Sequence, residues 1–224
     1  MRIRADFTRP VTLDTTALPW QPSPDGSVLR RMLDRIGDEV ARATSIVRYP
    51  PESRFPAHQH PLGEEFLVLD GVFSDEHADY AAGTYVRNPP GSGHSPHSDG
   101  GCTIFVKLRQ MPPTESRFAR VDASAGSWRA WRNLQRLDLF DADYETVFLA
   151  QTGPGEPVTL TLADTGLEAL VLAGGIEIDG ENHGPLAWLR RPPDRAPAIT
   201  LAADTRVWIK TGHLAAADEG IQAR

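Results

Sequence analysis

The sequence predicts an all-β protein made of two similar units. The chain has 224 residues with 19 Gly and 19 Pro, a density of turn residues that suits many short strands better than long helices. Sliding the sequence against itself by 103 positions aligns Leu67–Leu69 with Leu170–Leu172, and Lys107 with Lys210 (210 − 107 = 103). A constant offset over this span indicates duplication, so we expect two tandem units.

The N-terminal segment repeats as well, at an offset of 111 (118 − 7 = 111). The matching pairs are Phe7 with Phe118, Arg9 with Arg120, and Trp20 with Trp131. This segment is therefore expected to be an integral part of each unit rather than a loose arm. The sequence boundary falls near the Pro-rich turn at Pro112, which divides the chain into domains 1–112 and 113–224.

Composition excludes several classes of function. The formal net charge is −7, so the chain has no electrostatic footprint for nucleic acid or for an anionic membrane. The single cysteine, Cys102, allows no internal disulfide and is typical of a small core residue. The first residues contain no apolar signal segment, and no run approaches ~20 apolar residues. A cytoplasmic location is the simplest expectation.

The stretch from His58 to His94 carries the chemistry. His58 and His60 are two residues apart, so their side chains point to the same side of a strand. Glu64 begins a second strand-like run, and His94 follows a strong turn signal at Asn88–Gly91. Three imidazoles and one carboxylate on neighbouring strands suit a divalent transition metal.

This pattern resembles the two cupin motifs. The first matches His58-x-His60-x3-Glu64-x6-Gly71, except that Glu52 stands in place of the leading Gly; the second matches Gly83-x5-Pro89-x-Gly91-x2-His94, with Ser98 in place of Asn. The surrounding sequence is similar to ChrR-type cupins.

The resemblance implies two tandem cupin barrels of the double-stranded β-helix, or jelly-roll, type. It also implies that His58, His60, Glu64 and His94 hold one divalent metal in the first barrel. Zn or Fe is favoured, and Mn, Ni and Cu are alternatives, because the donor set alone does not select among these metals.

Other residues near the motif leave alternatives open. Glu65 is the other candidate carboxylate, but the spacing to Gly71 favours Glu64, and alternation turns Glu65 to the opposite face. His97 could support a metal ligand or contact substrate, but an exposed loop residue is favoured. His77 is expected in a solvated loop. Several strand residues that flank the motif could serve an enzyme but are more typical of a core: Tyr49, Phe66, Tyr85, Arg87, Phe105 and Lys107.

Two segments have ambiguous local structure. In residues 27–49 the apolar side chains fall at helical spacing, whereas the resemblance to cupins favours a hairpin, which we adopt. The tail from Leu214 to Arg224 is rich in Ala and charged residues and is expected to be a short helix or frayed.

The second repeat lacks the candidate ligands. The offset of 103 replaces them in order with Thr161, Ala163, Leu167 and Pro197. Its remaining histidines, His183 and His213, have no paired ligand spacing and are expected to be structural or exposed. The second barrel is thus predicted to be a degenerate, structural half.

Three functional hypotheses follow. The first is a metal-binding bicupin that binds or transforms a small molecule. The alternatives are an Fe(II)-dependent dioxygenase of β-dicarbonyl type and a zinc-dependent ChrR-like sensory module. With only Cys102, the chain lacks the His-x3-Cys-x2-Cys element of the anti-sigma domain. Whether the protein is an enzyme stays open. The expected partner is a small-molecule ligand or substrate, with no nucleic acid or membrane, in a monomer or homodimer.

Overall fold

The computed structural model describes residues 1–162, 165–193 and 198–214. Residues 215–224 of the predicted tail, and positions 163 and 197 of the second repeat, lie outside this description. The chain forms two compact units. The first contains Met1–Ala5 and Leu18–Gly126, and the second contains Asp6–Ala17 and the chain from Ser127 onward.

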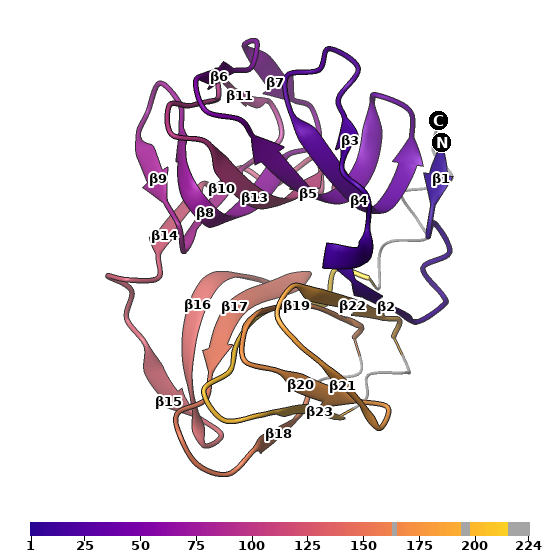
Figure 1. The fold of residues 1–224 in the computed structure, drawn as a ribbon, viewed down its shortest axis with the longest axis vertical. Helices are drawn as coiled ribbons and strands as arrows, with labels where there is room; N and C mark the ends of the chain where they lie inside the picture. Colours follow the sequence, from indigo (N-terminus) through magenta and orange to yellow (C-terminus); the bar gives the residue numbers. More distant parts are fainter. Residues whose placement is uncertain (163–164, 194–197, 215–224) are drawn as a thin grey trace. The chain divides into compact units, whose positions relative to one another are not determined.

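The first unit is built from strands alone (Figure 1). Its strands are β1 (Arg2–Ile3), β3 (Gln21–Pro22), β4 (Leu29–Gly37), β5 (Ala41–Tyr49), β6 (Ser53–Arg54), β7 (His58–His60), β8 (Glu64–Ser74), β9 (Asp79–Ala81), β10 (Thr84–Asn88), β11 (Ser92–His94), β12 (His97–Ser98), β13 (Cys102–Leu108) and β14 (Ala119–Asp122). The main path of its large sheet runs β1-β4-β5-β13-β8-β10-β14, and β7 and β11 form a separate two-stranded sheet.

The hairpin predicted over residues 27–49 is confirmed. Strands β4 and β5 pair antiparallel, with Leu29 opposite Arg48 and Gly37 opposite Ala41. The β-branched residues Ile46 and Val47 are buried in β5, where a pleated surface suits them. Burial against the barrel therefore overrides the helical spacing of the apolar residues.

The second unit repeats this architecture. Its elements are β2 (Val11–Asp14), the 3-10 helix η1 (Thr15–Ala17), β15 (Arg129–Trp131), β16 (Leu134–Ala142), β17 (Glu145–Gln151), β18 (Val158–Thr161), β19 (Leu167–Ala173), β20 (Ile176–Ile178), β21 (Glu181–His183), β22 (Ala187–Arg191), β23 (Ala198–Leu201) and β24 (Arg206–Thr211). They form a seven-stranded sheet, β15-β16-β17-β24-β19-β22-β2, and a four-stranded sheet, β18-β23-β20-β21. The all-β prediction is confirmed.

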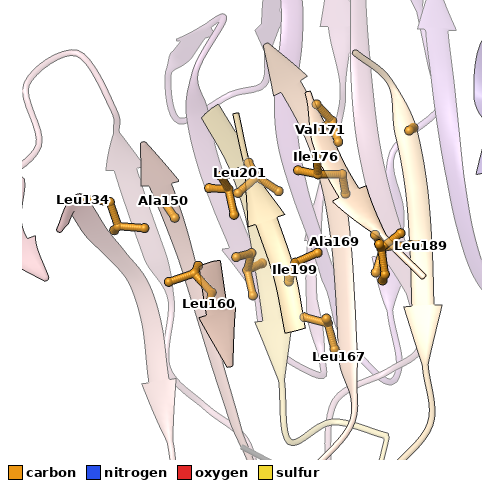
Figure 2. Packing of buried hydrophobic residues seen from close by; sticks show 14 of the residues in the cluster. Leu134, Ala150, Leu160, Leu167, Ala169, Val171, Ile176, Leu189, Ile199 and Leu201 are labelled. Carbon is orange, nitrogen blue, oxygen red and sulfur yellow. The ribbon is translucent and has the colours of Figure 1, made fainter. Parts of the chain in front are cut away.

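Aliphatic side chains from both sheets fill the interior of the second unit. Figure 2 shows Leu167 and Ala169 of β19 together with Leu160 of β18 and Ile199 of β23. Each of these four residues is 0% exposed. Packing of this kind, with several branched side chains removed from water, is sufficient to hold two sheets together.

The two compact units are not the continuous halves 1–112 and 113–224. Strand β14 pairs with β10, which places residues 119–122 in the first unit. Strand β2 pairs with β22, which places residues 11–14 in the second unit. The N-terminal segment of each repeat is therefore an integral part of the unit that the other repeat forms. Strand β14 of the second repeat hydrogen-bonds to β10 of the first repeat, and β2 of the first repeat hydrogen-bonds to β22 of the second.

Among the described residues, no helix has the length and apolar character needed to span a membrane.

Candidate metal centre

Local backbone structure brings four predicted residues to one place. His58 and His60 lie at the two ends of β7, and His94 of β11 pairs directly with His58. A turn closed by the Gly63 N–H, which donates to the His60 carbonyl at 3.1 Å, reverses the chain before Glu64 begins β8. The i, i+2 spacing, the strand pairing and the turn therefore each contribute to the cluster.

The donor atoms of these four residues converge. One nitrogen or oxygen from each of His58, His60, Glu64 and His94 lies within 4.8 Å of the others. The carboxylate of Glu64 has Oε1 at 3.5 Å from His94 Nε2 and Oε2 at 3.7 Å from His60 Nδ1. His60, Glu64 and His94 are buried, whereas His58 is partly exposed. The cluster thus reaches the surface on its His58 side.

Hydrogen bonds fix two of the imidazoles. His58 Nδ1 lies 2.9 Å from the Pro56 carbonyl oxygen, and His94 Nδ1 lies 3.2 Å from Asp75 Oδ2. A carbonyl and an ionised carboxylate only accept hydrogen bonds, so Nδ1 is the protonated nitrogen in each ring. The Nε2 lone pair of each ring is then available as a donor to a metal.

Burial and charge affect each group differently. Burial lowers the pKa of His60, with the neighbouring imidazoles adding to the effect of burial and Glu64 opposing it. Burial also acts against protonation of His94, but its hydrogen bond to Asp75 and the charges of Glu64 and Asp75 raise its pKa overall. Although burial opposes ionisation of Asp75, hydrogen bonds from His94 and from the backbone of His77 and Ala78 lower its pKa to about 2. Asp75 is therefore ionised.

The cluster fits a cation. His60 Nε2 is buried and has no hydrogen-bond partner among the described residues, an arrangement that costs free energy unless another group satisfies it. Three imidazole nitrogens and one carboxylate oxygen are a donor set suited to Zn, Fe, Mn, Ni or Cu.

Comparisons with known proteins agree with this architecture. Residues 8–112 match the family model described as the ChrR Cupin-like domain. No curated protein matches the sequence. Among solved structures, a candidate dioxygenase from Nostoc punctiforme is similar, with a TM-score of 0.73, 15% identity, and coverage of 91% of this chain and 82% of that one.

Two further structures show the same fold. The pirin YhhW from Escherichia coli in complex with nickel(II) has a TM-score of 0.69 and 12% identity, over 91% of this chain and 98% of that one. A variant of oxalate decarboxylase from Bacillus subtilis has a TM-score of 0.61 and 9% identity, over 90% of this chain and 76% of that one. Residues 8–112 thus match a cupin-like domain, and the chain has the cupin fold. At these identities the solved structures establish the fold alone.

In the first unit, Glu64 and not Glu65 lies with the histidines. Glu65 is buried elsewhere, where it accepts hydrogen bonds from Tyr85 Oη at 2.5 Å and from Arg87 at 3.0 Å. Lys107 is likewise buried and donates to Thr44 at 2.9 Å. Glu65 thus faces away from the cluster, as alternation along β8 predicts, and it forms a separate buried network with Tyr85 and Arg87.

The other histidines lie outside the cluster. His77 is exposed, and His97 is partly buried in β12, where it pairs with Arg54 of β6. In the second unit, His183 is partly buried, and His213 lies 2.9 Å from Glu168 Oε2. His213 is thus a structural residue, as one of the two sequence alternatives proposed.

The sequence alone did not identify Asp75 as part of this centre. Residues 74–79 have the pattern of a polar turn between strands, and Asp75 is 7% exposed in that turn. It accepts hydrogen bonds from the backbone N–H groups of His77 and Ala78 at 2.9 and 3.1 Å. An Asp that begins such a turn is a common local signal, but nothing in its spacing indicates that it also reaches His94.

Proposed function

We propose that the first barrel of this cupin binds one divalent transition metal through His58, His60, Glu64 and His94, and that a small oxygen-containing molecule binds at that metal. The convergence of the four donor groups within 4.8 Å carries the proposal. Its support is the orientation of two imidazoles by Pro56 and Asp75 and the buried, unpartnered nitrogen of His60.

A metal with four protein donors can keep positions for other ligands. A six-coordinate ion would have two, through which it can act as a Lewis acid or bind O2. His58 is the most exposed member of the cluster, so a small molecule would approach on that side. The protein's own residues hold the donors in place, keep His60 neutral through burial, and present Glu64 as the single anionic ligand.

The test is metal content by ICP-MS, after purification and after reconstitution with each candidate metal. We expect about one metal per chain in the wild type and almost none in the His58→Ala/His60→Ala double variant. The matched control is His77→Ala/His97→Ala, which also removes two imidazoles but from outside the cluster. Circular dichroism should show the same β-rich fold in all three proteins. Stoichiometric metal in the His58→Ala/His60→Ala variant would overturn the ligand assignment.

Dioxygenase chemistry is the second candidate, favoured by the likeness in fold to the candidate dioxygenase from Nostoc punctiforme. It predicts bound iron and O2 uptake on addition of a β-diketone, both absent from the double variant. Tightly bound zinc without O2 uptake would instead favour a ChrR-like sensory role, in agreement with the match over residues 8–112.

A further inference from the structure

We propose that Arg120 is a positioning residue of the metal centre, which fixes Glu64 through Asn88 and fixes His94 through Tyr80 and Asp75. The inference rests on the proposed metal-binding function. Arg120 lies beyond residues 8–112, which match the family model, and it belongs to β14, which pairs with β10 in the first unit. The metal centre would therefore depend on a residue outside the motif-bearing segment.

One arm of contacts leads from Arg120 to Glu64. Arg120 Nη2 donates to Asn88 Oδ1 at 2.7 Å. A guanidinium has no acceptor atom, so it determines that the Asn88 oxygen faces Arg120 and that the amide nitrogen faces away. Asn88 Nδ2 then lies 3.4 Å from Glu64 Oε1, to which it donates. Arg120 thus orients the amide that holds the carboxylate ligand.

The other arm leads from Arg120 to His94. Arg120 Nε donates to Tyr80 Oη at 3.2 Å, and the Tyr80 hydroxyl donates to Asp75 Oδ1, also at 3.2 Å. Asp75 Oδ2 accepts from His94 Nδ1 at 3.2 Å. Because the hydroxyl accepts from a permanent cation, its own proton is directed to Asp75, which in turn leaves His94 Nε2 facing the cluster.

The two arms meet again at the cluster and form a closed ring. Glu64 Oε1, where the first arm ends, lies 3.5 Å from His94 Nε2, where the second arm ends. Arg120 is itself anchored, since it pairs with Val86 across the strands and its Nη1 donates to the Arg87 carbonyl at 2.8 Å. The residue as a whole is exposed, but each of its three guanidinium nitrogens has a protein acceptor.

The second unit offers an internal control. In the strand pairing, Thr12 opposite Leu189 takes the position that Arg120 opposite Val86 has in the first unit. Arg9, which matches Arg120 only at the sequence offset of 111 (120 − 9 = 111), also belongs to the second unit. Its side chain is 81% exposed and forms an ion pair with Asp6 at 3.2 Å. Leu167 occupies the position of Glu64 in that unit, so the carboxylate on which the first arm would end is absent. The second unit therefore has neither an arginine at the position of Arg120 nor a carboxylate at the position of Glu64.

The experiment uses Co(II), whose visible absorption bands report coordination geometry, with the full chain in every case. The variants are Arg120→Ala, Arg120→Lys and, as matched control, Arg9→Ala. We measure the Co(II) dissociation constant by chelator competition, the absorption spectrum at saturation, and the melting temperature of the metal-free protein. Direct partners of metal ligands are worth about 10–100-fold in metal affinity. Arg120 acts through such partners, so Arg120→Ala should weaken Co(II) binding by about tenfold, the low end of that range, and shift the bands.

The conservative variant separates charge from geometry. A lysine keeps the positive charge but cannot hold Asn88 and Tyr80 at once as a guanidinium does. Arg120→Lys should therefore restore affinity only partly and keep an altered spectrum, whereas Arg9→Ala should match the wild type in all three measurements.

Two results would overturn the inference while leaving the proposed function intact. One is a wild-type dissociation constant and spectrum in Arg120→Ala. The other is weaker binding that follows the loss of metal-free stability while the saturated spectrum stays unchanged, which would make Arg120 a residue of the fold only. If the wild type binds no Co(II) or other transition metal, the proposed function fails and the inference fails with it.

Discussion

Glu64 of the first barrel and Leu167 of the second occupy the same position in the repeat, at the first residue of β8 and of β19. Glu64 lies among imidazoles, with His60 and His94 nitrogens at 3.7 and 3.5 Å. Leu167 is 0% exposed and packs in an aliphatic cluster (Figure 2). One barrel thus has a polar cluster where the other has a continuous apolar core.

The strand irregularities, by contrast, are shared. The pairing of β13 with β8 skips Leu69, and the pairing of β24 with β19 skips Leu172, at equivalent positions. Gly71 and Gly174 also correspond, with positive φ of 72° in both. A Cβ on Gly71 would clash with the Gly101 carbonyl oxygen, and one on Gly174 would clash with Thr205 Oγ1. The bulges and close backbone crossings therefore belong to the fold.

This comparison separates residues that build the barrel from residues that add chemistry to it. The barrel forms with either polar or apolar side chains at this position, because strand pairing and apolar burial are present in both units. The histidines and Glu64 can then be removed without removing the determinants of the fold. Exchanging Glu64 and Leu167 by substitution is the most direct test of whether the metal ligands are separate from the determinants of the fold.

The largest effect should come from Leu167→Glu. It places a carboxylate in an aliphatic cluster without histidines, and we expect it to lower the free energy of unfolding by more than about 3 kcal/mol, since an uncompensated buried charge is strongly destabilising. The reverse variant, Glu64→Leu, should abolish metal binding yet change the stability of the metal-free protein by less than about 2 kcal/mol, because the desolvation cost of Glu64 is also removed.

Urea unfolding followed by tryptophan fluorescence measures the first effect. Four of the five tryptophans, Trp128, Trp131, Trp188 and Trp208, lie in the second unit, so the signal reports mainly on the barrel that carries Leu167. If Leu167→Glu unfolds at the wild-type urea concentration, the second interior is not the dry core that its burial indicates, and the comparison fails.

Local pattern was sufficient to predict the convergence of the four cluster residues, because alternation and turn spacing act over a few residues. The hairpin of β4 and β5 was predicted from the resemblance to cupins, since the local spacing of apolar residues favoured a helix. It could not predict the contacts of Asp75 or Arg120. His94 is 19 residues from Asp75, and Asn88 is 32 residues from Arg120. The contact of Arg120 depends on which sheet edge accepts β14, and no local spacing encodes either pairing.

A second prediction distinguishes the two adjacent glutamates. Glu65→Gln should lower the free energy of unfolding by about 3 kcal/mol, because it removes the buried charge that pairs with Arg87, while metal affinity stays near that of the wild type. Glu64→Gln should do the opposite and weaken metal binding by more than about 100-fold, a larger loss than that of a ligand's partner. Calorimetric metal titration and urea unfolding of both variants provide the test.

Glu168→Gln is the counterpart in the second barrel. Glu168 accepts a hydrogen bond from Trp188 at 2.8 Å and lies 2.9 Å from His213, so this variant should destabilise the protein without any effect on metal affinity.

Equal loss of metal affinity in Glu64→Gln and Glu65→Gln would show that the assignment of Glu64 as the carboxylate ligand is incorrect.

The smallest effect concerns Cys102, which occupies the position of Thr205 in the second repeat (205 − 102 = 103). Burial raises the pKa of the Cys102 thiol to about 11, against a hydrogen bond with Ser98 that lowers it. The folded protein therefore disfavours the thiolate. Above the ordinary thiol pKa, the unfolded chain releases this proton and the folded chain retains it, so the thiol should reduce stability progressively as the pH rises from about 9 to about 11.

Comparison of wild type with Cys102→Ala isolates this contribution from other groups that titrate in the same range. The wild type should lose stability more steeply than the variant above about pH 9, and the two should have parallel profiles below it. Because the chain has one cysteine, reaction with a disulfide reagent gives a direct check. At about pH 8 the native thiol should react far more slowly than the same thiol in urea. Rapid reaction in the native state would show that the close contact of Gly71 with Gly101 and Cys102 opens. The first barrel would then be less tightly closed there than the second, where Thr205 donates a hydrogen bond to the Gly175 carbonyl at 2.9 Å.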